Sequence, residues 1–167
     1  MSMPGQPVET PDLQGFVDTL GTRVPDAVLG SSADGGEASL RVRKESLPAV
    51  LRVLKADLGF NALQDMIAMD RLTSMREGEK RFAVLYQLYR FPGGERLRVV
   101  VEVGEGESIG SATAVYRAAD WAEREIFDMF GLVFEGHPGL RRIYLPDEFD
   151  GHPLRKDFPL EGRNHGL

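Results

Sequence analysis

The stretch DWAEREIFDMFG, residues 120–131, decides the fold because it combines a helix start, an apolar stripe and a helix stop. Asp120 can cap the helix, and Glu123 at the third helical position completes a capping box. Gly131 stands where helices often end on a left-handed residue. The helical period divides the stretch into two faces. The core face consists of Ala122, Ile126, Met129 and Phe130. The opposite face consists of Trp121, Arg124, Glu125 and Asp128. The stretch therefore predicts a helix with one core face and one charged face around an aromatic ring.

Residues 132–167 differ in character, because neither a strand period nor a helix period persists and prolines interrupt the segment. Long segments of this kind are usually disordered or functional. Regularly supplied apolar residues, such as Phe134, Leu145 and Phe158, argue against disorder. Charged side chains lie between them. The sequence therefore predicts an extended tail that docks on another surface, for which a partner is a candidate.

Three further helical segments are predicted before residue 120. Thr10 caps the first, which spans 10–21 and has a proline at its first helical position. Ser46 caps the second, which Gly59 closes. Its core face is formed by Val50, Leu51, Leu54 and Leu58. A short helical segment over 110–117 leads into the helix at 120–130.

Strand patterns lie between these helices, over residues 39–43, 62–69, 81–90 and 97–103. The last two alternate apolar and polar residues across a turn, so they form a hairpin. A loop of small residues is predicted over 31–36. This order predicts an α+β fold with a mixed sheet and helices mainly on one face. Residues 1–131 form this single domain, and residues 132–167 follow as the extended docking tail.

The composition of the 167-residue chain excludes several functions. Its net charge of −6 argues against nonspecific nucleic-acid binding. The absence of cysteine excludes Cys-ligated iron–sulfur clusters and thiolate zinc sites. No apolar run reaches the roughly 20 residues that span a bilayer, and the first seven residues lack a signal-peptide pattern. We therefore expect any membrane association to come through other proteins.

Glu125 and Asp128 share a helix face, a spacing that an enzyme could use for acid–base or metal chemistry. Arg124 beside them favours a charge network, as found at interfaces. His137 and His152 each lie between Gly and Pro. Because no third ligand stands at a recognised spacing, a turn or interface role is favoured over a metal site.

The basic pairs in the tail could bind phosphate or an anionic lipid, but neighbouring acids favour ion pairs with another protein of an assembly. No residue is predicted to be catalytic or to bind a cofactor or a metal. The predicted partner interface consists of Trp121, Arg124, Glu125, Asp128, His137, Arg141, Arg142, His152, Arg155, Lys156 and Asp157.

Four motifs carry a resemblance to a known family: EREIFDMFG at 123–131, GHP at 136–138, LRRI at 140–143 and PLRKDFP at 153–159. They resemble the C subunit of bacterial NADH–quinone oxidoreductase and its mitochondrial counterpart, the iron–sulfur protein 3 subunit of respiratory complex I. Residues from about 39 onward resemble the α/β domain of this family more loosely.

The resemblance implies a peripheral-arm subunit without a redox centre, on the cytoplasmic face of the bacterial cell membrane. The complex would pass electrons from NADH through FMN and iron–sulfur clusters, held by partner subunits, to quinone and translocate protons. The implied neighbours are the quinone-proximal large D subunit and the cluster-bearing B and I subunits. One alternative is the equivalent subunit of a membrane-bound hydrogenase or another quinone- or ferredoxin-linked complex. A second is an independent enzyme that uses Glu125, Asp128 and His152.

Without cysteine or a nucleotide-binding loop, the purified chain should be colourless, poor in metal and unable to oxidise NADH. Absorbance spectra, metal analysis and an NADH oxidation assay measure these properties. A stoichiometric flavin or iron signal after mild purification would contradict this expectation.

Overall fold

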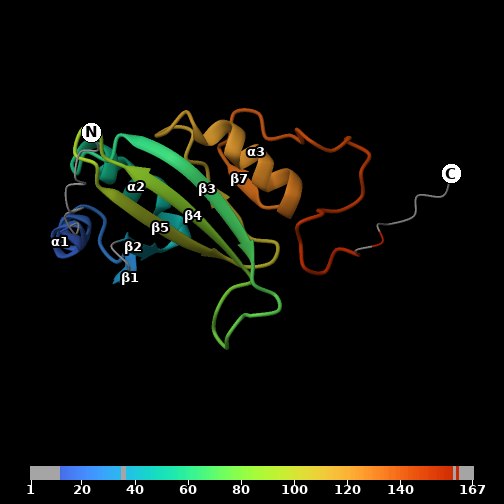
Figure 1. Cartoon of the computed structure of the whole chain (residues 1–167), viewed down its shortest axis with the longest axis horizontal. Coiled ribbons are helices and arrows are strands. Elements are labelled where there is room, and N and C mark those ends of the chain that lie inside the picture. The colour runs from blue at the N-terminus through green and yellow to red at the C-terminus, as the bar shows by residue number, and fades with distance from the viewer. Residues whose placement is uncertain (1–11, 35–36, 160, 162–167) are drawn as a thin grey trace, which may run out of the picture.

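The computed structural model describes residues 12–34, 37–159 and 161. Its main element is a five-stranded sheet in the order β1-β2-β5-β4-β3 (Figure 1). The strands are β1 (Val28–Asp34), β2 (Glu37–Val42), β3 (Ala62–Asp70), β4 (Phe82–Tyr89) and β5 (Arg96–Val103). β2 and β5 run parallel, whereas the other neighbours are antiparallel. The predicted mixed sheet of an α+β fold is confirmed.

The β4–β5 hairpin forms as its alternating pattern predicts. Facing residues of an antiparallel pair share one side of the sheet, so the apolar sets of both strands meet on the same face. Val84 faces Val101 and Tyr86 faces Val99. The buried set is Phe82, Val84, Tyr86, Leu88, Leu97, Val99, Val101 and Val103.

The helices α1 (Leu13–Arg23) and α2 (Leu47–Ala56) supply the other half of this core. A 3-10 turn, η1 (Lys44–Ser46), precedes α2. The predicted core face of α2 is confirmed, because Val50, Leu51 and Leu54 are buried and Leu58 packs against the same cluster. Phe16 and Leu20 of α1 join them.

The start of α1 differs from the prediction. Asp12 is the N-cap, and its side chain accepts a hydrogen bond from the Gly15 N–H at 3.0 Å. An aspartate caps a helix at least as well as a threonine, so the helix begins two residues later than predicted. The predicted cap, Thr10, lies outside the described residues. At the other end α1 continues past Gly21, because the Val24 N–H still bonds to the Leu20 carbonyl.

The loop predicted over 31–36 was wrong for residues 31–34, which belong to β1. Ser31 faces Leu40 and Ser32 faces Ser39 in an antiparallel ladder with β2. Backbone pairing with a neighbour forms this edge strand although its side chains have little intrinsic strand preference.

The helix predicted over 110–117 was also wrong. Ser108–Gly110 form the short strand β6, and consecutive turns follow it. β6 pairs in parallel with β7 (Val133–Glu135), so residues predicted to start the tail belong to a small second sheet. Leu132 and Phe134 are buried in the main core.

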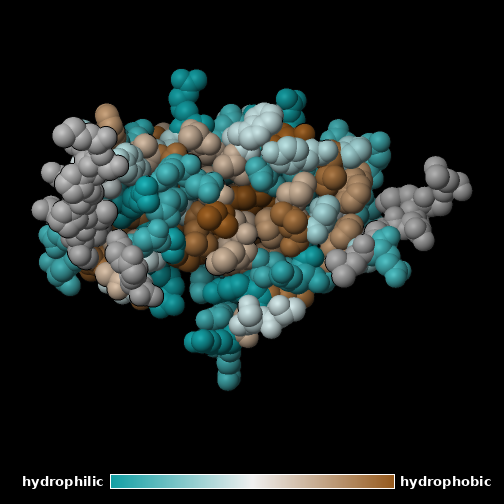
Figure 2. Space-filling view, viewed as in Figure 1, coloured by the Kyte–Doolittle hydropathy of each residue, from teal (hydrophilic) through white to brown (hydrophobic). Residues whose placement is uncertain are grey.

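The second face of the main sheet is less covered. Figure 2, in the view of Figure 1, shows hydrophobic side chains over the middle of the strands, with hydrophilic ones around them. Ile67 and Met69 of β3 are among the exposed large apolar residues. The helices α1 and α2 therefore leave apolar surface on this side of the sheet.

The capping box predicted for the last helix, α3 (Ala119–Phe130), was wrong. The helix starts at Ala119 without a side-chain cap. Glu123 is fully buried and accepts hydrogen bonds from the Ser111 hydroxyl and the Ala112 N–H, both at 2.6 Å. The turns after β6 offer these donors to the carboxylate, so Glu123 joins α3 to the domain. Burial raises the pKa of Glu123, and the two hydrogen bonds only partly oppose this effect.

A raised pKa makes the folded chain bind the Glu123 proton more tightly than the unfolded chain. This contribution to stability is complete below the ordinary value of 4.5 and is lost as pH rises through the folded pKa. We expect the free energy of unfolding of the wild type to fall relative to that of Glu123→Gln as pH rises above 4.5, because glutamine does not titrate. Urea unfolding at several pH values measures the difference, and parallel curves for the two proteins would contradict it.

Candidate partner interface on the last helix and the tail

Asp128 is a fully buried carboxylate near the end of α3. Its Oδ2 accepts hydrogen bonds from the N–H groups of Ile143, Tyr144 and Leu145 at 3.0, 2.8 and 3.1 Å. Its Oδ1 binds Nη1 of Arg142 at 2.7 Å. Donors from four consecutive residues thus converge on one side chain. This contact fixes the position and the register of the tail on α3.

The exposed charged face predicted for this helix was therefore wrong at Asp128. Burial acts to raise the pKa of this carboxyl, but the N–H groups of Tyr144 and Ile143 and the Arg142 guanidinium outweigh it and hold the pKa below its ordinary range. Through Nη2, Arg142 also donates to the carbonyls of Phe149 and Gly151 at 3.1 and 3.0 Å. The pair thus organises a tail segment that lacks regular secondary structure.

The two Gly-His-Pro motifs bind α3 in similar ways. The His137 ring bonds through Nε2 to the Asp120 carbonyl at 3.0 Å, and its Nδ1 accepts from the Gly139 N–H at 3.0 Å. The His152 ring bonds through Nδ1 to the Asp128 carbonyl at 2.9 Å. Eight residues of helix separate the two carbonyls, which is about 12 Å. A turn or an interface role was predicted for these histidines. The structure shows both rings docked on α3 of the same chain, and contact of either with a partner stays a prediction.

Gly131 ends α3 in the left-handed conformation, with φ 75°, as predicted. A Cβ at this position would lie 2.5 Å from Nε2 of His152. The Leu154 N–H satisfies the Met129 carbonyl at 3.1 Å. The tail therefore supplies donors that the last turn of a helix lacks, and it packs where only glycine leaves room.

A second charged contact, which the sequence patterns did not reveal, joins the tail to the end of the main sheet. Arg81, only 8% exposed, binds Asp70 with distances of 3.1 and 2.7 Å and Asp157 with distances of 3.0 and 2.8 Å. The Lys156 N–H donates to Asp70 at 2.9 Å. Asp70 and Asp157 lie 11 and 76 positions from Arg81, so no local spacing could reveal this cluster.

The pKa values of this cluster follow from its contacts. Burial acts to raise the pKa of Asp70, but hydrogen bonds from Arg81 and from the N–H groups of Lys156 and Leu72 lower it to about 2. The hydrogen bond from Arg81 likewise lowers the pKa of Asp157. All three groups therefore carry charge at neutral pH.

The other predicted interface residues fall into two groups. Arg155 pairs with Glu105 and lies over the Phe82 ring, so it belongs to the Arg81 cluster, while Lys156 is exposed beside it. Trp121 and Glu125 are exposed on α3, and Arg141 is exposed on the tail. Arg124 pairs with Asp120 at 2.8 Å. Whether these residues contact a partner stays a prediction.

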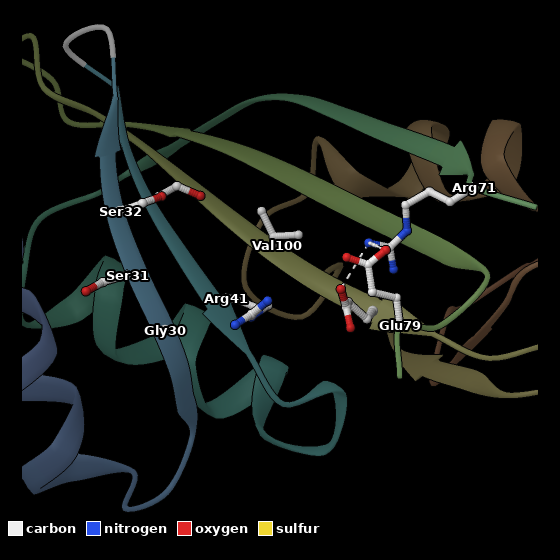
Figure 3. A pocket seen from close by; sticks show the side chains of 9 residues that line it. Gly30, Ser31, Ser32, Arg41, Arg71, Glu79 and Val100 are labelled. Atoms are coloured by element: carbon white, nitrogen blue, oxygen red, sulfur yellow. Dashed lines mark hydrogen bonds and ion pairs between the residues drawn. The ribbon is translucent and has the colours of Figure 1, made fainter. Parts of the chain in front are cut away.

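A shallow depression of about 390 Å³ lies on the open face of the sheet (Figure 3). Ser31 and Ser32 lie toward one end and Arg71 and Glu79 toward the other, where Arg71 pairs with Glu102 at 3.0 Å. A second depression, of about 220 Å³, is lined by His152 but by neither Glu125 nor Asp128. These cavities do not bring together the three residues of the hypothetical independent enzyme.

Within residues 12–34, 37–159 and 161, no three histidine, aspartate or glutamate side chains are grouped as metal ligands would be. In the same part of the chain, no helix has the length and apolar character needed to cross a membrane.

The fold and the motifs of the tail point to one class of protein. The family model described as Respiratory-chain NADH dehydrogenase, 30 Kd subunit, matches residues 40–164, and the chain belongs to this family.

Its relatives narrow the assignment to the C subunit of NADH–quinone oxidoreductase. The C subunit of Citrifermentans bemidjiense is 44% identical over 144 residues, which are 86% of this chain and 87% of the relative. The C/D subunit of Bdellovibrio bacteriovorus is 49% identical over 123 residues, 74% of this chain and 21% of the longer protein. The predicted membership in the C-subunit family of complex I is confirmed.

Two solved structures share the fold. A trypsin-resistant fragment (1–134) of Nqo5 superposes with a TM-score of 0.62 at 36% identity, covering 66% of this chain and 89% of the fragment. A chain of an archaeal membrane-bound sulfane sulfur reductase gives a TM-score of 0.71 at 22% identity, covering 88% and 85%. The second likeness shows the fold alone.

Asp128→Asn should release the tail while the domain stays folded. Asparagine loses the negative charge that Arg142 and three N–H groups bind, and breaking one side of a buried ion pair costs roughly 3–5 kcal/mol. Trypsin cleavage after Arg141 and Arg142, followed by mass spectrometry, should become much faster. Glu148→Gln is the matched control, because Glu148 is an exposed acid of the same tail. Equal cleavage rates in the wild type and Asp128→Asn would refute the anchoring role.

Proposed function

We propose that the chain is a structural subunit of the peripheral arm of a proton-translocating NADH–quinone oxidoreductase and acts through binding rather than chemistry. The observation that carries this role is the tail, which Asp128 holds in a fixed register on α3. The tail is fixed by a buried charge and presents the exposed side chains of Tyr144 and Leu154, which suits contact with other proteins.

The redox groups, FMN and iron–sulfur clusters, belong in this proposal to partner subunits. The absence of cysteine from the chain supports this, because cysteine thiolates hold most protein iron–sulfur clusters. The electron path from NADH to quinone then passes beside this subunit.

The D subunit is the first proposed neighbour. The Bdellovibrio relative, a C/D subunit, carries both parts in one polypeptide, which supports a close association of the two. The B and I subunits are further candidates, on the family resemblance. The proposed location is the cytoplasmic face of the bacterial cell membrane, where the other subunits would hold the chain peripherally.

The related Nqo5 fragment supports a division between domain and tail. That fragment is trypsin-resistant and matches only 66% of this chain. A domain that resists trypsin as a shorter fragment is consistent with a tail whose main role is docking.

Affinity purification of the tagged full-length chain from native membranes tests the proposal. The expected result is recovery of NADH–quinone oxidoreductase subunits, including the D subunit, with NADH–quinone activity in the eluate. Recovery of hydrogenase subunits would favour the related complex instead. Recovery of the chain alone, or NADH oxidation by the chain alone, would contradict the structural role.

Arg155→Glu separates assembly from catalysis. The new carboxylate would face Glu105, so repulsion should lift the end of the tail from the Arg81 cluster. We expect about a tenfold or greater loss of assembled complex, because the lifted end of the tail no longer presents its surface to the neighbouring subunit and a loss of about 1.4 kcal/mol in binding is already tenfold. Turnover per assembled complex should stay near normal. Normal amounts of complex with strongly reduced turnover would show that Arg155 serves the chemistry directly.

A further inference from the structure

Two of the most exposed aromatic side chains lie together on the α3 side of the molecule. Among the described residues, the exposed large aromatic side chains are Phe91, Trp121 and Tyr144. Phe91 lies in the β4–β5 turn, whereas Trp121, 59% exposed, is on α3 and Tyr144, 60% exposed, is on the tail segment bound to α3. Single exposed apolar residues are ordinary, but two large aromatic residues beside one helix suggest a contact surface.

Glu125 lies between these two aromatic residues. Trp121, Glu125 and Asp128 follow one another along a single stripe of α3 at positions i, i+4 and i+7. The Tyr144 hydroxyl lies 3.5 Å from Oε2 of Glu125, at the long limit of a hydrogen bond. The carboxylate therefore has one aromatic residue a turn before it on the helix and another beside it on the tail.

The buried anchor fixes this arrangement before any partner arrives. The Tyr144 N–H binds Asp128 at 2.8 Å, and its two neighbours bind the same oxygen. Tyr144 therefore cannot slide along α3 without breaking the whole anchor. A surface that is ordered in advance loses little entropy on binding, which favours it as the centre of an interface.

The charge of this surface is not balanced within the described part of the chain. Glu125 has only its long contact with the Tyr144 hydroxyl there. The neighbouring cation, Arg124, is already paired with Asp120 at 2.8 Å. An approaching surface would leave the Glu125 carboxylate desolvated unless it brought a positive charge.

We propose that Trp121, Glu125 and Tyr144 form a receptor for an arginine side chain of the adjoining protein in the complex. The inference rests on the proposed docking role and names the chemistry of the partner at that surface. A guanidinium is planar, so it stacks on aromatic rings while its edge donates two hydrogen bonds to a carboxylate. A purely apolar partner would bury the Glu125 carboxylate without a counter-charge, and Glu125 would repel an anionic lipid headgroup.

Photocrosslinking in the intact complex tests the identity of the partner group. The full-length tagged chain would carry p-benzoylphenylalanine in place of Tyr144, and in a matched control in place of Phe91. After irradiation of native membranes, we expect the first protein to join a neighbouring protein of the complex at a segment that contains an arginine. Crosslinks to lipid, to a second copy of the chain, or to a segment without arginine would overturn the proposal.

Substitutions test the energetics with the same complex. Trp121→Ala and Glu125→Lys should each lower recovery of the complex about tenfold or more, as expected for central interface residues. Tyr144→Phe should have little effect, because it retains the ring. Glu77→Lys makes the same charge change at an exposed site in the β3–β4 loop and should leave recovery unchanged.

Exchange of the two charges completes the test. Replacing the crosslinked arginine with glutamate should lower recovery, and combining that change with Glu125→Arg should restore it at least tenfold. Failure of the exchange, or normal recovery with Trp121→Ala and Glu125→Lys, would overturn the arginine receptor. If the wild-type chain still recovers the complex in those experiments, the proposed function stands. If the wild-type chain recovers no complex, the proposed function fails first.

Discussion

The position of the whole tail depends on one buried carboxylate. Asp128 is withdrawn from water, which is costly, and four donors from residues 142–145 compensate for that cost. Since a buried charge with missing donors is strongly unfavourable, the loss of any of the four would weaken the contact. A segment without helix or strand periodicity thereby acquires a single register. Tyr144 and the turn around His152 take their places from that register.

A second group of charges completes the attachment at the far end of the tail. Arg81 gathers Asp70 from β3 and Asp157 from the tail, and the depressed pKa values of both carboxyls show that each charge favours the folded arrangement. The two histidine rings bind the helix carbonyls of Asp120 and Asp128. The tail is thus held at several points along its length, which suits a subunit whose role is to present a defined surface to neighbouring proteins.

The motifs that identify the family are largely the residues that build this attachment. Asp128, Gly131, His137, Arg142 and His152 all act within the chain. The four polar side chains among these bind backbone atoms or one another and are partly or wholly buried, and Gly131 leaves room for the His152 ring. The surface available to a partner is formed by neighbours such as Trp121 and Tyr144. The family motifs therefore specify the scaffold, and the residues that this scaffold supports form the surface proposed for the contact.

The sequence by itself determined the hairpin, the core face of α2, the end of α3 at Gly131 and the family. Each depends on a local period or on a residue with special backbone freedom, and both are visible along the chain. Tertiary structure alone decided which partners the buried polar residues have. Glu123 does not cap α3 but accepts hydrogen bonds from Ser111 and Ala112. Asp128 binds the tail instead of lying exposed. The edge strand β1 formed where a loop was predicted. Arg81 pairs with Asp157, which lies 76 positions away in the sequence. Partners of this kind come from distant segments, and local pattern holds no information about which segments will meet.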